Sequence, residues 1–222
     1  MAQILQEFTI VRRILPPDSL PWPLLVLPSV IDRLRERYKF EEVSKAEGEK
    51  QAIVGRNGEI VISGAPRGIQ LLAFEPNIVH TQSSGGANVA EGLFEDIGVF
   101  VHELDPSRTM SLEYTKTFQT IAVAKLSVPF EAIFSEKFLQ YQHNTLTKTL
   151  ALPDGRPEIN LASLSFRVSY ATNKTNFVYL PKPLTIEPRS GSKLSDQIYY
   201  TQSPTDPDTH RKLLEELEQA LG

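Results

Sequence analysis

The stretch HTQSSGGANVAEGLFEDIGVFVHEL, residues 80–104, changes its side-chain pattern in the middle. Its second part places apolar residues at helical spacing, namely Leu93, Ile97, Val101 and Leu104. This period predicts a helix from Val89 to Leu104, because side chains three and four positions apart share one face. The glycine-rich turn before the helix predicts that a strand ends near Gln82. The stretch therefore closes a group of strands with a helix.

A strand and a helix precede this group of strands. Residues 7–15 alternate apolar and polar side chains, which is typical of a strand. Five prolines in residues 16–28 then prevent a helix until Ser29, a residue type suited to an N-cap. Segments rich in β-branched and aromatic residues fill residues 39–82, and Asn57-Gly58 among them predicts a hairpin turn.

The second half of the chain repeats this order of elements. Residues 111–126 predict a strand, and residues 129–142 predict a helix. Three further strands are expected within residues 159–171, 177–187 and 197–202. A helix ends the chain, with Asp206 as its N-cap, Pro207 at its first position and leucines along one face.

Both halves thus predict an α+β protein of two tandem units, each of order β-α-β(3–4)-α. Each unit is expected to be an antiparallel sheet covered by helices on one face. The units are residues 1–107 and 108–222, with one continuous domain as the alternative. This pseudo-repeat is one of element order, without residue-level identity between the halves. The same order occurs in TATA-binding-protein-like and helix-grip folds, an analogy of topology that carries no function.

The glycine-rich turn at residues 83–86 raises the question of phosphate binding, because such turns gather backbone N–H groups. Residues 68–107 contain six acidic residues and no Lys or Arg, so a phosphate would be repelled. The turn also lacks the Lys-Ser/Thr pair of a P-loop and the spacing of a dinucleotide fold. We therefore interpret it as a flexible loop and helix cap.

A stripe of ionisable side chains follows on the predicted helix. Glu91, Glu95 and His102 fall on one face, where two carboxylates and an imidazole are able to bind a divalent metal. A solvated helix face explains the same pattern, and metal-binding helices usually carry two histidines or a Glu-x-x-His pair. We expect no metal here and keep these three residues as the alternative. No recognised catalytic or cofactor motif occurs, so catalytic residues and cofactors are predicted as none.

The composition of the 222-residue chain limits its class. It has 41% hydrophobic residues, a net charge of −4 and no cysteine, which excludes disulfides and thiolate chemistry. Neither a signal peptide nor an apolar run of membrane-spanning length is present, so we expect a cytoplasmic protein without membrane contact. The charge distribution gives no basic face of the kind that nucleic acid requires.

The proline-rich segment PPDSLPWPLLVLPS, residues 16–29, holds the only tryptophan of the chain. As a stiff extended arm it offers a possible interface through Trp22, Leu24, Leu25 and Leu27. The other interpretation is a crossover that packs its leucines onto the protein's own sheet, as most apolar runs do.

These observations predict a cytoplasmic, non-enzymatic interaction protein that acts by binding another protein or by self-association. One alternative is a small-molecule-binding protein or hydrolase with a pocket between sheet and helix. Another is a nucleic-acid-associated accessory protein, which depends only on the topology analogy.

Overall fold

The computed structural model describes residues 2–46, 51–107, 110, 115–127, 129, 163–166 and 183–221. The chain divides into two compact units that are interleaved along the sequence. Unit 1 comprises Met1–Gln6, Ala122–Gln202 and Arg211–Gly222, whereas unit 2 comprises Glu7–Ile121 and Ser203–His210. Residues 107 and 108, between which the sequence analysis placed a boundary, both lie within the span of unit 2.

The described elements begin with a strand, two helices and four strands. They are β1 (Gln3–Ile14), α1 (Trp22–Leu25), α2 (Pro28–Tyr38), β2 (Glu42–Ala46), β3 (Ala52–Ile62), β4 (Ala65–Glu75) and β5 (Ile78–Ser84). A long helix and four more strands follow, and a helix ends the chain. These are α3 (Ala87–Leu104), β6 (Thr115–Lys125), β7 (Leu164–Phe166), β8 (Leu184–Pro188), the 3-10 helix Leu194–Asp196, β9 (Ile198–Ser203) and α6 (Pro207–Leu221).

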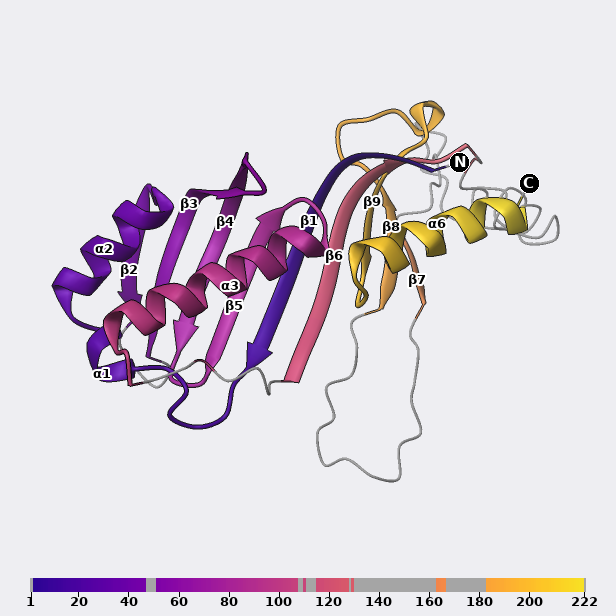
Figure 1. The fold of residues 1–222 in the computed structure, drawn as a ribbon. Coiled ribbons are helices and arrows are strands. Elements are labelled where there is room, and N and C mark those ends of the chain that lie inside the picture. Colours follow the sequence, from indigo (N-terminus) through magenta and orange to yellow (C-terminus); the bar gives the residue numbers. More distant parts are fainter. Residues whose placement is uncertain are drawn as a thin grey trace, which may run out of the picture. The chain divides into compact units, whose positions relative to one another are not determined.

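The strands form one nine-stranded sheet in the order β2-β3-β4-β5-β1-β6-β9-β8-β7 (Figure 1). The predicted fold class, two tandem units each with its own antiparallel sheet covered by helices, is therefore wrong. Strands β1 and β6 are neighbours in this order, so neither is left as a sheet edge. An edge strand exposes unpaired N–H and C=O groups, and pairing these two strands removes two such edges. The side-chain pattern of a strand fixes its two faces but not which strand lies beside it.

Several predicted elements are confirmed. The first strand, the long helix after residue 86 and the helix after Asp206 are β1, α3 and α6. The Asp206 carboxylate accepts hydrogen bonds from the backbone N–H groups of Asp208 and Thr209, both at 3.1 Å, as an N-cap does. A helix does follow the prolines, as α2, but it begins at Pro28 with Leu27 as its N-cap, so the N-cap predicted at Ser29 is wrong. The helix predicted at 129–142 lies outside the described residues apart from Pro129.

The hairpin predicted at Asn57-Gly58 is wrong, because β3 runs through both residues. The chain turns instead at Ser63 and Gly64, whose φ angles are 52° and 77°. Two consecutive positive φ values match the type I′ turn, whose twist suits a hairpin. Asn57 also has a positive φ, 51°, and its side-chain amide donates a hydrogen bond to Glu41 at 2.8 Å. The Asn-Gly pair thus accommodates a local irregularity in a strand.

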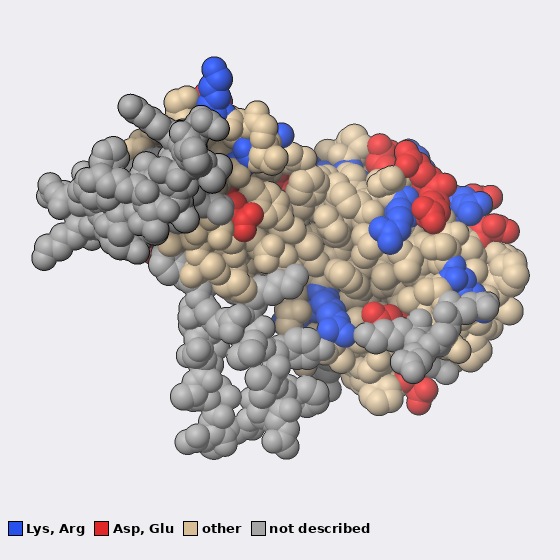
Figure 2. Space-filling view, turned by 180° about the vertical axis from the view of Figure 1, so that it is seen from behind, with Lys and Arg blue, Asp and Glu red and all other residues tan. Residues whose placement is uncertain are grey.

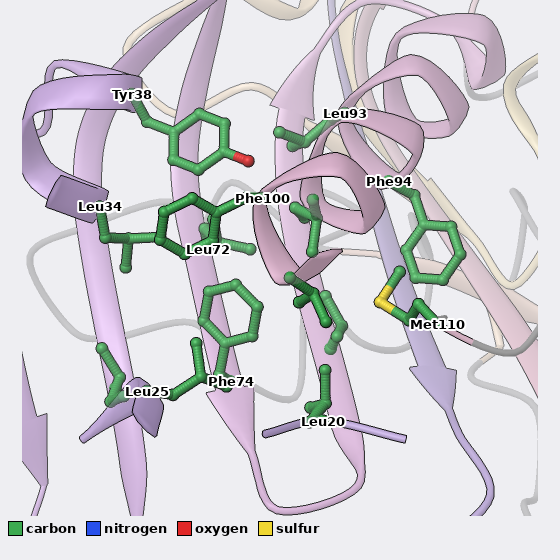
Figure 3. Packing of buried hydrophobic residues seen from close by; sticks show 14 of the residues in the cluster. Leu20, Leu25, Leu34, Tyr38, Leu72, Phe74, Leu93, Phe94, Phe100 and Met110 are labelled. Carbon is green, nitrogen blue, oxygen red and sulfur yellow. The ribbon is translucent and has the colours of Figure 1, made fainter. Parts of the chain in front are cut away.

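Helices α1, α2 and α3 contribute to a core on one side of the sheet of unit 2. Figure 2 looks onto the side away from these helices. On the helix side, Leu34 and Tyr38 of α2 reach toward Phe100 of α3, above Leu72 and Phe74 of β4 (Figure 3). The rings of Tyr38 and Phe100 meet edge to face with centroids 6.5 Å apart. All five side chains are at most 2% exposed, so this layer is closed to solvent.

Two glycines of β3 make room for Phe40, which follows α2. A Cβ atom built on Gly55 would lie 2.5 Å from the Phe40 ring. A Cβ atom on Gly58 would lie 2.4 Å from the same ring and 2.5 Å from the carbonyl oxygen of Tyr38. The aromatic ring therefore lies directly on the bare backbone of the strand, and only glycine permits this approach.

Unit 1 has a smaller core. It consists of Ala124, Leu126, Ile186, Tyr199 and Leu214, with Leu217 packed against it. Leu214 of α6 is fully buried, and Leu213 and Leu217 are half-buried, so the leucine face expected for the last helix does pack on strands.

We predict opposite effects for two glycine-to-alanine changes. Gly58→Ala should lower the free energy of unfolding by about 1 to 3 kcal/mol, because the added methyl group overpacks Phe40 and meets a backbone oxygen. Gly98→Ala, in the middle of α3, meets only the Met110 Cε atom at 3.8 Å. It should leave stability unchanged or raise it by up to about 1 kcal/mol through helix propensity. Urea unfolding measures the free energy of unfolding of both variants. A Gly58→Ala variant as stable as the wild type would contradict the close packing of Phe40 on β3.

Candidate functional site

The sheet of unit 2 presents a face that α1, α2 and α3 do not cover. Along β1 and β5 the buried residues alternate with half-buried ones. The buried set, Thr9, Val11, Arg13, Val79, Thr81 and Ser83, lies on the helix side. The other set and its neighbours on β3 and β4 define the open face. Its members are Phe8, Ile10, Arg12, Ile14, Val54, Arg56, Glu59, Val61, Leu71, Ala73, Glu75, Ile78, His80, Gln82 and Ser84.

The strand register arranges the open face in rows. Ile10 lies opposite Gln82, which lies opposite Leu71. The next row joins Arg12, His80 and Ala73, and the one after it joins Ile14, Ile78 and Glu75. Half-buried apolar residues therefore lie in the first and third of these rows, whereas Ala73, the apolar residue of the middle row, is buried.

Charged residues are sparse among the inner strands of this face. On β1, β4 and β5 the members of this face that belong to the charged residue types are Arg12, which lies opposite His80, and Glu75, which lies opposite Ile78. In Figure 2 residues other than Lys, Arg, Asp and Glu make up most of the described surface in this view. On the outer strands Arg56 lies opposite Glu42 in register, and Glu59 pairs with Lys39 at 2.7 Å. The open face is thus mostly uncharged and carries both signs.

The helix side of β1 buries a cation. The Arg13 side chain is 0% exposed, and its guanidinium lies 3.0 Å from the Glu91 carboxylate and 4.0 Å above the Phe94 ring. Its Nη2 group also donates to the Ala90 carbonyl at 3.4 Å. Lys116 of β6 binds the second oxygen of Glu91. Burial raises the pKa of Glu91, but the hydrogen bond from Lys116 and the charge of Arg13 outweigh this effect and lower it.

The contacts with Arg13 and Lys116 engage Glu91, the first residue of the alternative metal site. Glu91 already holds two cations, and both of its oxygens are engaged. Glu95 and His102 are exposed on the same helix. Among the residues that the structure describes, no group of three or more His, Cys, Asp or Glu side chains is placed to hold a metal ion.

The glycine-rich turn has a structural role. Gly86 is the N-cap residue of α3, and Gly85 has a φ of 106°. The Thr9 hydroxyl donates to the Gly85 carbonyl at 2.7 Å, and the Gly85 N–H donates to the Glu7 carbonyl at 3.4 Å. These contacts hold the turn between β1 and α3, as expected for a helix cap.

A serine and histidine pair lies at the start of α6. The His210 Nδ1 atom is 2.7 Å from the Ser203 hydroxyl, which is 2.7 Å from the Thr205 hydroxyl. The Thr120 hydroxyl of β6 donates to the Thr205 carbonyl at 2.7 Å. The distance suits a base and a nucleophile, yet Ser203 and His210 are both 0% exposed. No substrate reaches them in this arrangement, so the network joins β6, the end of β9 and the first turn of α6.

The described surface hollows are shallow and rich in charge. One of about 350 Å³ is lined by Arg33, Glu36, Arg37, Phe100 and Glu103. Its Arg37 binds both oxygens of Asp96 at 2.9 Å and also Glu103, which clamps α2 to α3. Burial raises the pKa of Asp96, but the hydrogen bonds from Arg37 outweigh it and lower the pKa. A second hollow, of about 210 Å³, is lined by Ser127, Glu215, Glu218 and Gln219 of unit 1.

The four residues of the predicted arm are placed differently from one another. Leu25 is 1% exposed and belongs to the core of unit 2. Trp22 packs against that core, and its indole N–H donates to the Gln51 side chain at 3.1 Å. Leu24 is half-buried, and Leu27 is 44% exposed. The arm is thus a short helix anchored on its own unit, and its role as an interface stays a prediction.

Sequence reasoning missed the open face, the buried Arg13 and the Ser203–His210 pair. For β1 a signal existed: its alternation assigns Ile10, Arg12 and Ile14 to one face and Val11 and Arg13 to the other. His210 lies four residues after the N-cap Asp206, but nothing in the sequence pairs its side chain with Ser203.

Comparison with known proteins finds no match among family models, curated proteins or solved structures. Within the described part of the chain, no helix combines the length and the apolar character needed to cross a bilayer.

We predict that His210 makes stability depend on pH. Burial lowers the pKa of His210 from 6.5 to about 4, so the folded protein binds the proton more weakly than the unfolded chain. The stabilisation is complete above pH 6.5 and is lost as the pH falls toward 4. Between pH 7 and pH 5 the free energy of unfolding should fall by about 2 kcal/mol from this group alone.

Urea unfolding of the wild type and of His210→Asn at both pH values measures this effect. The asparagine side chain keeps a polar atom near Ser203 but does not titrate. The variant should therefore lose about 2 kcal/mol less than the wild type over this range. Equal losses in the two proteins would show that His210 is not the group that titrates.

Proposed function

We propose that this chain is a non-enzymatic cytoplasmic protein that acts by binding another polypeptide chain, and that the open face of unit 2 is its binding surface. The observation that supports this is the contrast between the two sides of one sheet. Three helices cover one side, whereas on the other side the described residues of unit 2 place apolar side chains and no helix. Apolar patches on a protein surface commonly mark sites of interaction.

Burial of the open face would supply the free energy of binding. Phe8, Ile10, Ile14, Leu71 and Ile78 are all half-buried before any partner is present. Fully burying one such side chain contributes about 1.5 to 3 kcal/mol relative to full exposure, so each contributes a fraction of that amount. Several fractions together are enough for specific association, because a few residues usually dominate an interface.

The positions of the reactive groups favour binding over catalysis. Ser203, His210 and Arg13 are fully buried. On the open face, the described residues form no serine and histidine pair at hydrogen-bond distance, and the polar residues are spread over separate rows. The charges of the face also favour a protein partner over nucleic acid, since Arg12 and Arg56 share it with Glu59 and Glu75.

The cytoplasmic location is part of the proposal. The chain has no cysteine, so its folding depends on no disulfide and on no oxidising compartment. The arm formed by Trp22, Leu24, Leu25 and Leu27 stays in the proposal as a second surface, with Leu27 as its most exposed member among those four.

Site-specific photocrosslinking in cells of the source organism tests this function. The amino acid p-benzoylphenylalanine replaces Ile10 on the open face, Leu27 on the arm, or Val99, which is 53% exposed on α3. We expect a covalent adduct with a polypeptide at position 10 and none at position 99. The size of the adduct, measured by mass spectrometry, identifies what was bound.

An adduct at position 27 alone would move the binding surface to the arm. The absence of an adduct at position 10, with the variant folded by circular dichroism, would contradict binding through the open face.

A further inference from the structure

We infer that Asn57 is a modification site, at which the side-chain amide converts spontaneously to a carboxylate, and that Glu41 and strand β3 slow this conversion. The modification is independent of the proposed binding function. Its basis is the residue pair at positions 57 and 58, together with the contacts that hold this pair in the folded protein.

The sequence and the exposure of Asn57 select this position. Asparagine is among the chemically labile residues, and its deamidation begins when the backbone nitrogen of the next residue attacks the side-chain amide. That next residue is Gly58, which has no Cβ atom to hinder the attack. Asn57-Gly58 is the only Asn-Gly pair in the sequence. Asn57 is also exposed, so water and hydroxide reach it.

The reaction has two steps. The Gly58 nitrogen forms a bond with the Asn57 Cγ atom, the bond between Cγ and Nδ2 breaks, and the Gly58 proton leaves with Nδ2 as ammonia. Water then opens the five-membered imide ring at one of its two carbonyl groups. One opening gives aspartate, and the other gives isoaspartate, in which the main chain runs through the side chain.

The fold engages both groups that must react. The Asn57 Nδ2 atom donates to the Glu41 carboxylate at 2.8 Å, and the Asn57 carbonyl accepts the Glu41 N–H at 3.3 Å. Gly58 pairs with Ile69 of β4 in the strand ladder. The attack requires rotation of the peptide unit between Asn57 and Gly58, and these contacts oppose that rotation.

Packing on Gly58 adds a second restraint. A Cβ atom at this position would lie 2.4 Å from the Phe40 ring and 2.5 Å from the Tyr38 carbonyl oxygen, so these residues lie directly against β3. Asn57 has a φ of 51°, a left-handed conformation that Arg56 and Gly58 do not share. The reaction therefore requires a local opening in which residues 38–41 separate from this part of β3.

Conversion would weaken the same contacts. An aspartate at position 57 has no side-chain N–H to donate, and its charge would lie within hydrogen-bond distance of the Glu41 carboxylate. Isoaspartate also adds one atom to the main chain between Arg56 and Gly58, whose pairs with β4 belong to one register. Converted molecules should therefore open more often at this place than unconverted ones.

Rates of conversion test the inference. The wild type is incubated at mildly alkaline pH, both folded and in denaturing urea. Trypsin cleaves after Arg56 and Arg67, so it releases residues 57–67 as one peptide. Mass spectrometry with electron-transfer fragmentation measures asparagine, aspartate and isoaspartate at position 57. We expect conversion in both samples, at least about tenfold slower in the folded protein, because the reaction there requires the opening.

Variants at position 41 test the role of Glu41. Glu41→Ala removes the acceptor of the Asn57 amide and should speed conversion in the folded protein at least about threefold. Glu41→Gln keeps an acceptor oxygen and should stay close to the wild type. The matched control is Glu42→Ala, at an exposed neighbour that pairs with Arg56 in register, and it should leave the rate unaltered. Circular dichroism establishes that each variant is folded, and Glu41→Ser replaces the alanine variant if it is not.

Equal rates in the folded and the unfolded protein overturn the inference, because the fold would then give no protection. The absence of conversion in folded wild type and folded Glu41→Ala, over a time in which the unfolded chain converts fully, overturns it as well. A Glu41→Ala variant that converts no faster than Glu42→Ala removes the role of Glu41 and has the same consequence.

Asn77 provides the internal control for the choice of position. It is followed by Ile78, whose branched side chain hinders attack by its own backbone nitrogen. In the urea sample Asn77 should stay intact while Asn57 converts. Conversion of both residues at one rate would contradict the selection of Asn57 by Gly58.

Discussion

Unit 2 depends on the alternation of side chains along β1, because successive side chains of a strand point to opposite faces of its sheet. Strand β1 pairs with β5 from Phe8 to Ile14, so each of its side chains is committed either to the core under α3 or to the open face. Arg12 and Arg13 are adjacent in sequence, yet one lies on the open face and the other is fully buried. A shift of the register by one residue would exchange them and would place Val11 outside. The buried ion pair, the apolar core and the proposed interface all depend on this register.

The buried polar groups on the helix side add specificity at a cost in stability. Taking the Arg13 charge out of water is expensive, and Glu91, Phe94 and the Ala90 carbonyl offset that cost only in one geometry. The hydrogen bonds that connect Thr120, Thr205, Ser203 and His210 likewise require one arrangement of the two segments of unit 2 that carry these residues. An apolar layer in these places would tolerate sliding between elements, whereas directional contacts do not.

Local patterns in the sequence predicted those elements whose signals are local. The period of Leu93, Ile97 and Val101 gave α3, and the Asp206-Pro207 pair gave the start of α6. The joining of all strands in one sheet was missed, because the pairing of β1 with its neighbours depends on residues far away in the chain. The hairpin prediction at Asn57-Gly58 failed for a related reason. The pair permits a positive φ, but in the structure Asn57 adopts it within β3, where its side chain bonds to Glu41. The open face was not predicted because a half-buried isoleucine has the same sequence pattern as a core one.

Trp22 gives the chain an optical property that follows from its position. It is the only tryptophan in the sequence, and it packs against the core of unit 2 with its indole N–H bonded to Gln51. Selective excitation of the indole therefore reports on unit 2, while the tyrosine of the unit 1 core, Tyr199, contributes nothing to that signal. Fluorescence accordingly observes unit 2, whereas far-ultraviolet circular dichroism observes the backbone of both units. Transitions that coincide by both methods indicate that the two units unfold together, and transitions that separate indicate that they unfold one after the other.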